Sequence, residues 1–93
     1  MTSTSRGAGE SMSQFTMYST TWCGYCRRLK SALNREGITF HEVDIEADPK
    51  SADLVMSLNG GNAVVPTLVF ADGSSLTNPS PSQVKAKLTA TAS

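Results

Sequence analysis

The chain has 93 residues, 39% of them hydrophobic, and its eight basic and eight acidic side chains balance to no net charge. This length fits one domain with a small core and excludes a second domain of ordinary size. A neutral chain is a poor match for nucleic acid or another polyanion. No apolar run approaches the roughly 20 residues of a membrane span, so we expect no association with membranes.

The start of the chain has a composition of its own. Residues 1–13 are rich in Ser, Thr and Gly and contain no apolar signal core. We therefore expect a disordered tail over residues 1–13, a single domain over residues 14–93, and a cytoplasmic location. The cytoplasm keeps thiols reduced, so a close pair of cysteines there is more often redox-active than structural.

The first half of the domain shows the pattern of a strand, a helix and a second strand. A short apolar run predicts a strand over Gln14–Tyr18, and a helix is predicted over Gly24–Glu36. It is ended by Gly37, in the position that a left-handed C-cap prefers. A second strand is predicted over Ile38–Ile45. The apolar residues of the helix are spaced by three and four, which places them on one inward face: Cys26, Leu29 and Leu33. The opposite face carries Arg27, Arg28, Lys30, Asn34 and Arg35.

A second helix is signalled by the residues at both of its ends. Asp48 is a suitable N-cap and Pro49 a suitable first helical residue, while Asn59-Gly60-Gly61 stops the helix after about Leu58. We expect its core face to include Val55 and Leu58.

Two further strands follow as a hairpin. They are predicted over Val65–Phe70 and Ser75–Thr77, and they flank Asp72-Gly73. That dipeptide is the two-residue signal for a type I′ turn.

The last helix begins with a capping box. Ser80 and Gln83 have the spacing of reciprocal caps. Val84 and Leu88 then form one face, with Lys85 and Lys87 exposed. The predicted order is βαβαββα, an α/β fold in which the first βαβ unit is parallel and right-handed and the closing hairpin is antiparallel. One mixed four-stranded sheet should pack between helices.

Cys23 and Cys26 are the only cysteines, and they flank the start of the first helix. A thiolate attacks a disulfide sulfur, and a second thiol three residues on can close a small ring that expels the product. Cys23 lies at the helix N-terminus, where a cysteine pKa of about 8.5 falls to roughly 3.5–7.5. We expect a thiol-disulfide oxidoreductase with Cys23 as nucleophile, and Cys26 as the partner in a redox-active disulfide.

The cysteine pair has two other interpretations. A zinc site needs about four ligands, yet beyond the two cysteines the chain offers only His41, so we expect no metal site. A purely structural pair is the second alternative. The position at a helix start favours catalysis over both.

Several motifs, taken together, are more specific than the cysteine pair alone. They are Tyr18-Ser19-Thr20-Thr21-Trp22-Cys23-Gly24-Tyr25-Cys26, Glu42-Val43-Asp44-Ile45, Asn59-Gly60-Gly61-Asn62, Val65-Pro66-Thr67 and Asp72-Gly73 followed by Leu76-Thr77-Asn78-Pro79. Over about residues 14–90 the chain resembles the glutaredoxins, which have the thioredoxin fold. It is most similar to the mycoredoxins, bacterial members that use mycothiol instead of glutathione.

The resemblance implies a cis-proline at Pro66, in a loop beside the cysteine motif. A cis X-Pro bond would expose the backbone of Val65, whose N–H and C=O could pair with an extended thiol ligand as a sheet edge does. An ordinary trans proline opening an edge strand is the alternative.

Departures from the glutathione-type members guide the choice of ligand. Gly24 stands where those members usually have proline, and Thr20 where they often have lysine; Thr77-Asn78-Pro79-Ser80 replaces a Gly-Gly pair and helix-start acids. Those elements serve the charged ends of glutathione. The hydroxyl and amide groups of Thr77 and Asn78 suit the hydroxyls of an uncharged sugar-thiol such as mycothiol. Ser80 could serve only as a helix cap.

Two aromatic residues flank the expected nucleophile. Tyr25 and Trp22 could supply apolar ligand surface and an O–H or N–H hydrogen bond. For Tyr25 we expect a ligand-binding role, because a residue between two redox cysteines is hard to bury. For Trp22 a binding role and a structural role are equally supported.

The resemblance implies reduction of mycothiol mixed disulfides on proteins by Cys23, with mycothiol as the reducing co-substrate and no bound cofactor. The expected partners are mycothiol and mycothiolated proteins, and the protein is expected to be a monomer. Three alternatives stay open: a thioredoxin-type protein-disulfide reductase, an iron-sulfur carrier that uses Cys23 from two chains plus two small thiols, and a redox-inert binding module.

Overall fold

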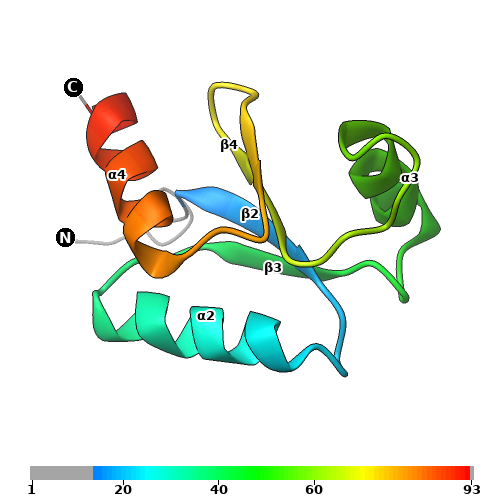
Figure 1. Ribbon diagram of the computed structural model, residues 1–93, viewed down its shortest axis with the longest axis horizontal. Coiled ribbons are helices and arrows are strands. Elements are labelled where there is room, and N and C mark those ends of the chain that lie inside the picture. The colour runs from blue at the N-terminus through cyan, green and yellow to red at the C-terminus, as the bar shows by residue number, and fades with distance from the viewer. Residues whose placement is uncertain (1–13, 93) are drawn as a thin grey trace, which may run out of the picture.

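The computed structural model describes residues 14–92 of the chain, so the predicted tail over residues 1–13 lies outside it. The elements alternate as predicted and are shown in Figure 1. In chain order they are β2 (Phe15–Ser19), α2 (Gly24–Arg35), β3 (His41–Asp44), α3 (Pro49–Leu58), β4 (Thr67–Phe70), β5 (Ser75–Thr77) and α4 (Pro81–Ala92). No helix in this part of the chain is long and apolar enough to cross a membrane.

The four strands form one mixed sheet in the order β3-β2-β4-β5. β2 and β3 run parallel with Thr16 opposite His41, and β4 is antiparallel to both β2 and β5. The predicted βαβ unit and closing hairpin are therefore confirmed. The order also brings the carboxyl ends of β2, β3 and β5 and the amino end of β4 to one edge of the sheet.

The core lies between the sheet and the pair α2 and α4, whereas α3 lies apart from that pair in Figure 1. Alternate residues of β2 and β4 point to this core, as the pleat of a strand requires. The buried cluster consists of Phe15, Met17, Leu29, Leu33, Leu68, Phe70 and Val84. Cys26, Leu29 and Leu33 are all buried, which confirms the inward face predicted for α2.

Two predicted strands begin later than expected. β3 starts at His41 rather than Ile38, because the N–H of Ile38 donates to Leu33 O (3.0 Å) and still belongs to the end of α2. β4 starts at Thr67 rather than Val65, since Pro66 has no N–H to give to a ladder. β2 is shifted by one residue, to Phe15–Ser19.

The core face of α3 was predicted in part wrongly. Val55 is fully buried, but Leu58 is 39% exposed. The amide of Asn59, four residues after Val55, bonds instead to Thr67 of β4 at 3.2 Å. The side of α3 that faces the sheet therefore contains Val55 and the polar C-cap residue Asn59, and it does not contain Leu58.

The turn between β4 and β5 is not type I′. That turn needs positive φ at both central residues, whereas Gly73 has φ +88° and Asp72 is not among the residues with positive φ. Gly73 N donates to Phe70 O and Phe70 N donates to Ser74 O, both at 2.9 Å. This is the longer loop that ends in a left-handed glycine. Two hydrogen bonds from Ser74 to the Asp72 carboxylate, the larger effect from its hydroxyl and the smaller from its N–H, lower the pKa of Asp72 to about 2.

The capping box of α4 is confirmed. Ser80 N donates to Gln83 Oε1 (2.7 Å), and Gln83 N donates to Ser80 Oγ (3.2 Å). Val84 is fully buried. Lys87, predicted as exposed, is only 25% exposed because it lies over the Phe70 ring and pairs with Asp72.

Candidate active site

The two cysteines lie where the loop after β2 enters α2, at the edge of the sheet that four strand ends share. Cys23 is the N-cap of α2, with extended backbone angles (φ −80°, ψ 107°). Its Sγ accepts the N–H of Cys26 at 3.1 Å. An N-cap position aims unpaired backbone N–H groups at its side chain and favours negative charge there.

Cys23 and Cys26 form a disulfide, with their Cα atoms 5.3 Å apart. Cys26 is 2% exposed and points into the core side of α2, as predicted. Cys23 retains 8% exposure in this oxidised form, which is less than its expected role as an open nucleophile suggests. Cys23 is still the more exposed of the two cysteines, as expected.

The Val65–Pro66 peptide bond is cis, as the family resemblance implied. Pro66 is buried, and its C=O accepts the N–H of Asn78 at 2.8 Å. Among residues 14–92, the N–H and C=O of Val65 have no hydrogen-bond partner. The loop therefore offers one unpaired donor and one unpaired acceptor, the pattern of an open sheet edge.

A residue that sequence reasoning missed holds this loop in place. Asn59 donates through Nδ2 to Val55 O (2.8 Å) and to Thr67 Oγ1 (3.2 Å), and its Oδ1 accepts the hydroxyl of Thr77 (2.6 Å). Thr67 Oγ1 in turn donates to Val64 O at 2.8 Å. In the sequence Asn59 stands out as a helix-stop residue and as part of a family motif, but no local signal reveals its partners.

Thr77 and Asn78, predicted as ligand-binding residues, are both exposed at the end of β5. The Thr77 hydroxyl hydrogen is used by Asn59, so this side chain can offer a ligand only its oxygen lone pairs. Asn78 has a left-handed φ of 52° and adjoins the Pro66 loop through its backbone. Ser80 serves α4 as a cap, which supports the structural interpretation of that residue.

The two aromatic residues beside the cysteines differ in exposure. Tyr25 is half-buried against the core, and its hydroxyl donates to Pro79 O at 2.7 Å. Tyr25 is thus more enclosed than expected from the sequence, and a ligand-binding role for it stays a prediction. Trp22 is 66% exposed, and its Nε1 donates to Glu46 Oε2 at 2.9 Å.

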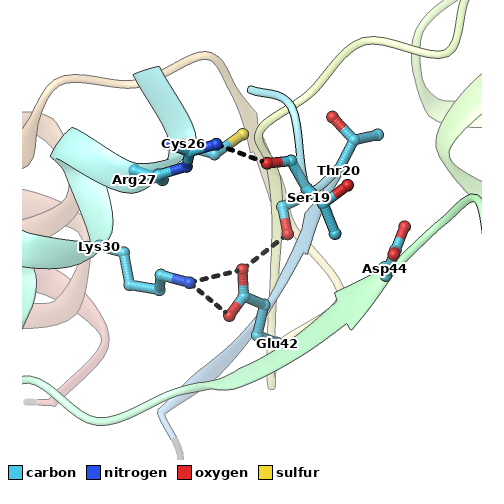
Figure 2. Close-up of a pocket in the computed structure, with 8 residues that line it drawn as sticks. Ser19, Thr20, Cys26, Arg27, Lys30, Glu42 and Asp44 are labelled. Carbon is cyan, nitrogen blue, oxygen red and sulfur yellow. Dashed lines mark hydrogen bonds and ion pairs between the residues drawn. The ribbon is translucent and has the colours of Figure 1, made fainter. Parts of the chain in front are cut away.

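A polar pocket of about 370 Å³ adjoins the cysteine motif on the β3 side (Figure 2). It is lined by Ser19, Thr20, Thr21, Cys26, Arg27, Lys30, Glu42 and Asp44. Lys30 Nζ pairs with Glu42 Oε1 at 2.9 Å, and Ser19 Oγ donates to Glu42 Oε2 at 2.7 Å. Partial burial raises the pKa of Glu42, but these two hydrogen bonds outweigh it and bring the pKa below its ordinary value.

A family model described as glutaredoxin matches residues 15–75, the span that contains the cysteine motif and the cis-proline. The chain belongs to the glutaredoxin family. A protein of Mycobacterium tuberculosis assigned to the glutaredoxins is 60% identical over 73 residues, which are 78% of this chain and 87% of that protein. Mycoredoxin 1 of Corynebacterium glutamicum is 41% identical over 81 residues, 87% of this chain and 100% of that protein.

Solved structures agree with this assignment. The crystal structure of a glutaredoxin from Archaeoglobus fulgidus superposes with a TM-score of 0.66 at 26% identity, over 86% of this chain and 90% of that one. The fold is thus the thioredoxin-like fold of glutaredoxins. As a glutaredoxin and a homologue of mycoredoxin 1, the chain is a thiol-disulfide oxidoreductase.

Proposed function

We propose that this glutaredoxin reduces mycothiol mixed disulfides on proteins, with Cys23 as nucleophile and mycothiol as the resolving thiol. The observation that carries the proposal is the position of Cys23: it is the N-cap of α2, and its sulfur accepts a backbone N–H. That position stabilises a thiolate, the form of cysteine that attacks disulfides. Cys26 is 2% exposed against 8% for Cys23, so it is the less accessible of the two.

The thiol ligand is proposed to lie on the β4–β5 side of Cys23. Within the part of the chain that the structure describes, the N–H and the C=O of Val65 have no partner, and both can pair with the amide groups of an extended ligand. Thr77 and Asn78, both exposed, follow on the next strand of the sheet. Tyr25, the second residue of α2, reaches Pro79 O on this side, and Trp22, in the loop before Cys23, adds exposed aromatic surface next to the nucleophile.

The choice of mycothiol rests on the absence of charge around this side. Residues 54–71 and 73–84 contain no Lys, Arg, Asp or Glu, although they supply the Val65–Pro66 loop and the end of β5. Glutathione has carboxylates that need cationic partners, whereas a sugar-thiol presents hydroxyls that pair with neutral polar groups. The relationship to mycoredoxin 1 supports the same choice.

The reaction follows as two thiol-disulfide exchanges. The Cys23 thiolate attacks the mycothiol sulfur of the mixed disulfide, the bond between that sulfur and the client protein breaks, and the client leaves as a thiolate. A second mycothiol thiolate then attacks the mycothiol sulfur bound to Cys23. This step forms the disulfide of mycothiol and restores the Cys23 thiolate. The cycle needs no bound cofactor, and we propose that it runs in a cytoplasmic monomer.

Removal of mycothiol from a mycothiolated client protein by the Cys23→Ser and Cys26→Ser variants tests the proposal. The first variant should lose all measurable turnover, while the second keeps it, because the cycle uses one sulfur of the enzyme. Retained turnover in Cys23→Ser, or complete loss in Cys26→Ser, contradicts the assignment of roles.

The ligand is tested separately by turnover with mycothiol and with glutathione at equal thiolate concentration. We expect a clear preference for mycothiol. Equal rates would contradict the argument from missing charges. Turnover with a protein reductase but with neither small thiol would identify a thioredoxin-type enzyme instead.

A further inference from the structure

Thr20, in the loop between β2 and α2, carries a buried hydroxyl without a partner. The residue is 6% exposed, and its Oγ1 makes no hydrogen bond within residues 14–92. Folded proteins satisfy the large majority of their buried polar side-chain atoms, because an unpaired one costs about 1–3 kcal/mol. In this oxidised form the hydroxyl makes no hydrogen bond to either cysteine sulfur, although it lines a pocket together with Cys26. A change in redox state could therefore give it a partner.

The pocket of Figure 2 indicates which group that partner is. Thr20 and Cys26 line it together, and Cys23 does not line it. In the oxidised form the Cys26 sulfur is bonded to Cys23 and carries no charge. Opening the disulfide turns that sulfur into a thiol or a thiolate, and a thiolate is a strong hydrogen-bond acceptor.

The cationic groups of the pocket already have partners. Lys30 Nζ contacts both carboxylate oxygens of Glu42, at 2.9 and 3.2 Å. Arg27 Nη2 donates to Thr21 O at 2.9 Å. Asp44 is an acceptor, and its Oδ1 holds the N–H of Glu46 at 2.9 Å. Each of these charged side chains thus has at least one partner, whereas the Thr20 hydroxyl has none within residues 14–92.

We propose that the Thr20 hydroxyl donates a hydrogen bond to the Cys26 thiolate when the disulfide is open, and so controls how readily Cys26 attacks. This inference rests on the proposed role of Cys23 and adds a role for the pocket on the β3 side. Burial otherwise disfavours the thiolate of Cys26. The hydroxyl offsets part of that penalty.

The step concerned is closure of the internal disulfide. With mycothiol attached to Cys23, the Cys26 thiolate attacks the Cys23 sulfur, and a Cys23–Cys26 bond forms. The bond between Cys23 and mycothiol breaks, and mycothiol leaves as a thiolate that takes a proton from water. No other oxidant or reductant is required, because the mixed disulfide supplies the oxidised sulfur. Thr20 thereby sets the division between the cycle that uses Cys23 alone and the route through both cysteines.

The experiment compares Thr20→Val, Thr20→Ser and Thr21→Val in the full chain. Thr21→Val is the matched control, because Thr21 is the exposed neighbour and only its backbone C=O contacts Arg27. Each reduced protein is mixed with the disulfide of mycothiol, and the second release of mycothiol, which accompanies ring closure, is followed in time. Thr20→Val should slow this release several-fold, because the fall in the thiolate fraction of Cys26 outweighs the rise in its nucleophilicity. Thr20→Ser and Thr21→Val should stay near the unmodified protein.

Two further readouts distinguish a bond to sulfur from a structural role. In a Cys23→Ser background, the pH profile for alkylation of Cys26 should move to higher pH with Thr20→Val and not with Thr21→Val. The redox equilibrium should shift toward the disulfide by up to about tenfold, or about 30 mV for a two-electron couple, since the hydroxyl has its partner only in the reduced form. The oxidised Thr20→Val protein should unfold at no lower temperature than the unmodified one.

Equal ring-closure rates in Thr20→Val and Thr21→Val would overturn the inference, as would an unchanged alkylation profile. A large drop in the melting temperature of oxidised Thr20→Val would also overturn it, by showing that the hydroxyl supports the fold. None of these outcomes contradicts the proposed function. That function fails if Cys23→Ser keeps its turnover, a result that does not depend on the Thr20 variants.

Discussion

The loops on the two sides of the cysteine motif each bury a threonine, and the two threonines are in opposite situations. Thr67, behind the cis-proline, is fully buried; its hydroxyl donates to Val64 O and accepts from Asn59. Thr20, behind Cys23, is 6% exposed and its hydroxyl has no partner among the described residues. The side chain behind the first loop has both its donor and its acceptor capacity used, whereas the hydroxyl behind the second retains an unused donor. This difference separates a rigid binding surface from a site whose chemistry changes with redox state.

The same two sides differ in charge. The β3 side carries Arg27, Lys30, Glu42 and Asp44 around one pocket. Residues 54–71 and 73–84, which build the β4–β5 side, contain no charged residue, and Asp72 between them lies in the hairpin turn and pairs with Lys87. Charged groups near Cys26 can change the pKa of its thiol. The neutral surroundings of the cis-proline suit an uncharged ligand. The proposed ligand and the proposed control of Cys26 therefore lie on opposite sides of Cys23.

The largest expected effect comes from valine at Thr67. Thr67→Val leaves Val64 O without its donor and Asn59 Nδ2 without one of its acceptors, so we expect a loss of about 2–3 kcal/mol in the free energy of unfolding. Urea unfolding of the oxidised proteins measures this loss. Thr20→Val is the matched control and should lose nothing. Equal losses in the two variants would remove the contrast between the loops.

Asn59→Ala should weaken the same loop by a different route. It removes the bonds to Val55, Thr67 and Thr77, and we expect a loss of roughly 1–2 kcal/mol in unfolding free energy. Because these bonds hold the residues proposed to bind mycothiol, KM for a mycothiolated substrate should rise several-fold while kcat changes little. Asn62→Ala is the control, since Asn62 only donates to Asn59 O at 3.3 Å. A fall in kcat at constant KM would place Asn59 in the chemical step instead.

Tyr25→Phe tests the link between the two sides. The Tyr25 hydroxyl joins the cysteine motif to Pro79 O at 2.7 Å, and its removal should cost about 1 kcal/mol of unfolding free energy. Tyr18→Phe is the matched control, because the Tyr18 hydroxyl has no hydrogen bond within residues 14–92. Indistinguishable melting curves for the two variants would show that the Pro79 contact contributes no stability.

The smallest effect concerns Glu42 and acid. Its pKa in the folded protein is lowered from the ordinary 4.5: partial burial opposes the change, and the bonds from Lys30 and Ser19 outweigh it. A lowered pKa gives stability that is complete above 4.5 and is lost as the pH falls through the folded value. Since the pair is about a third exposed, we expect about 0.5 kcal/mol or less. The stability difference between the unmodified protein and Glu42→Gln should shrink as pH falls from 6 to about 3; a difference that grows would contradict the sign.

Local patterns predicted most of the framework. The spacing of Cys26, Leu29 and Leu33 identified the buried face of α2, and the capping box at Ser80 and Gln83 identified the start of α4. Both depend on residues within a turn or two of one another, which is the range over which helix periodicity and capping act. The strand starts were less accurate, because Ile38 is held by the end of α2, a contact that apolar patterning does not report.

The cis bond at Pro66 came from the family resemblance, not from local physics, and the structure contains it. The turn at Asp72-Gly73 shows the limit of a dipeptide signal, because the same two residues also suit a longer loop with one left-handed glycine. Leu58 shows another limit. Its spacing from Val55 fits the core face, yet the bond between Asn59 and Thr67 sets which side of α3 meets the sheet.

By itself the sequence determined the order of the elements, the inward face of α2 and the pair Cys23 and Cys26 at a helix start, because periodicity, caps and motif spacing act between near neighbours in the chain. Only the tertiary structure decided that Asn59 ties α3 to β4 and β5, that the Tyr25 hydroxyl donates to Pro79 O, and that the Thr20 hydroxyl has no partner within residues 14–92. Those facts depend on contacts between segments far apart in sequence. Whether a buried polar group is paired is known only once every neighbour is in place.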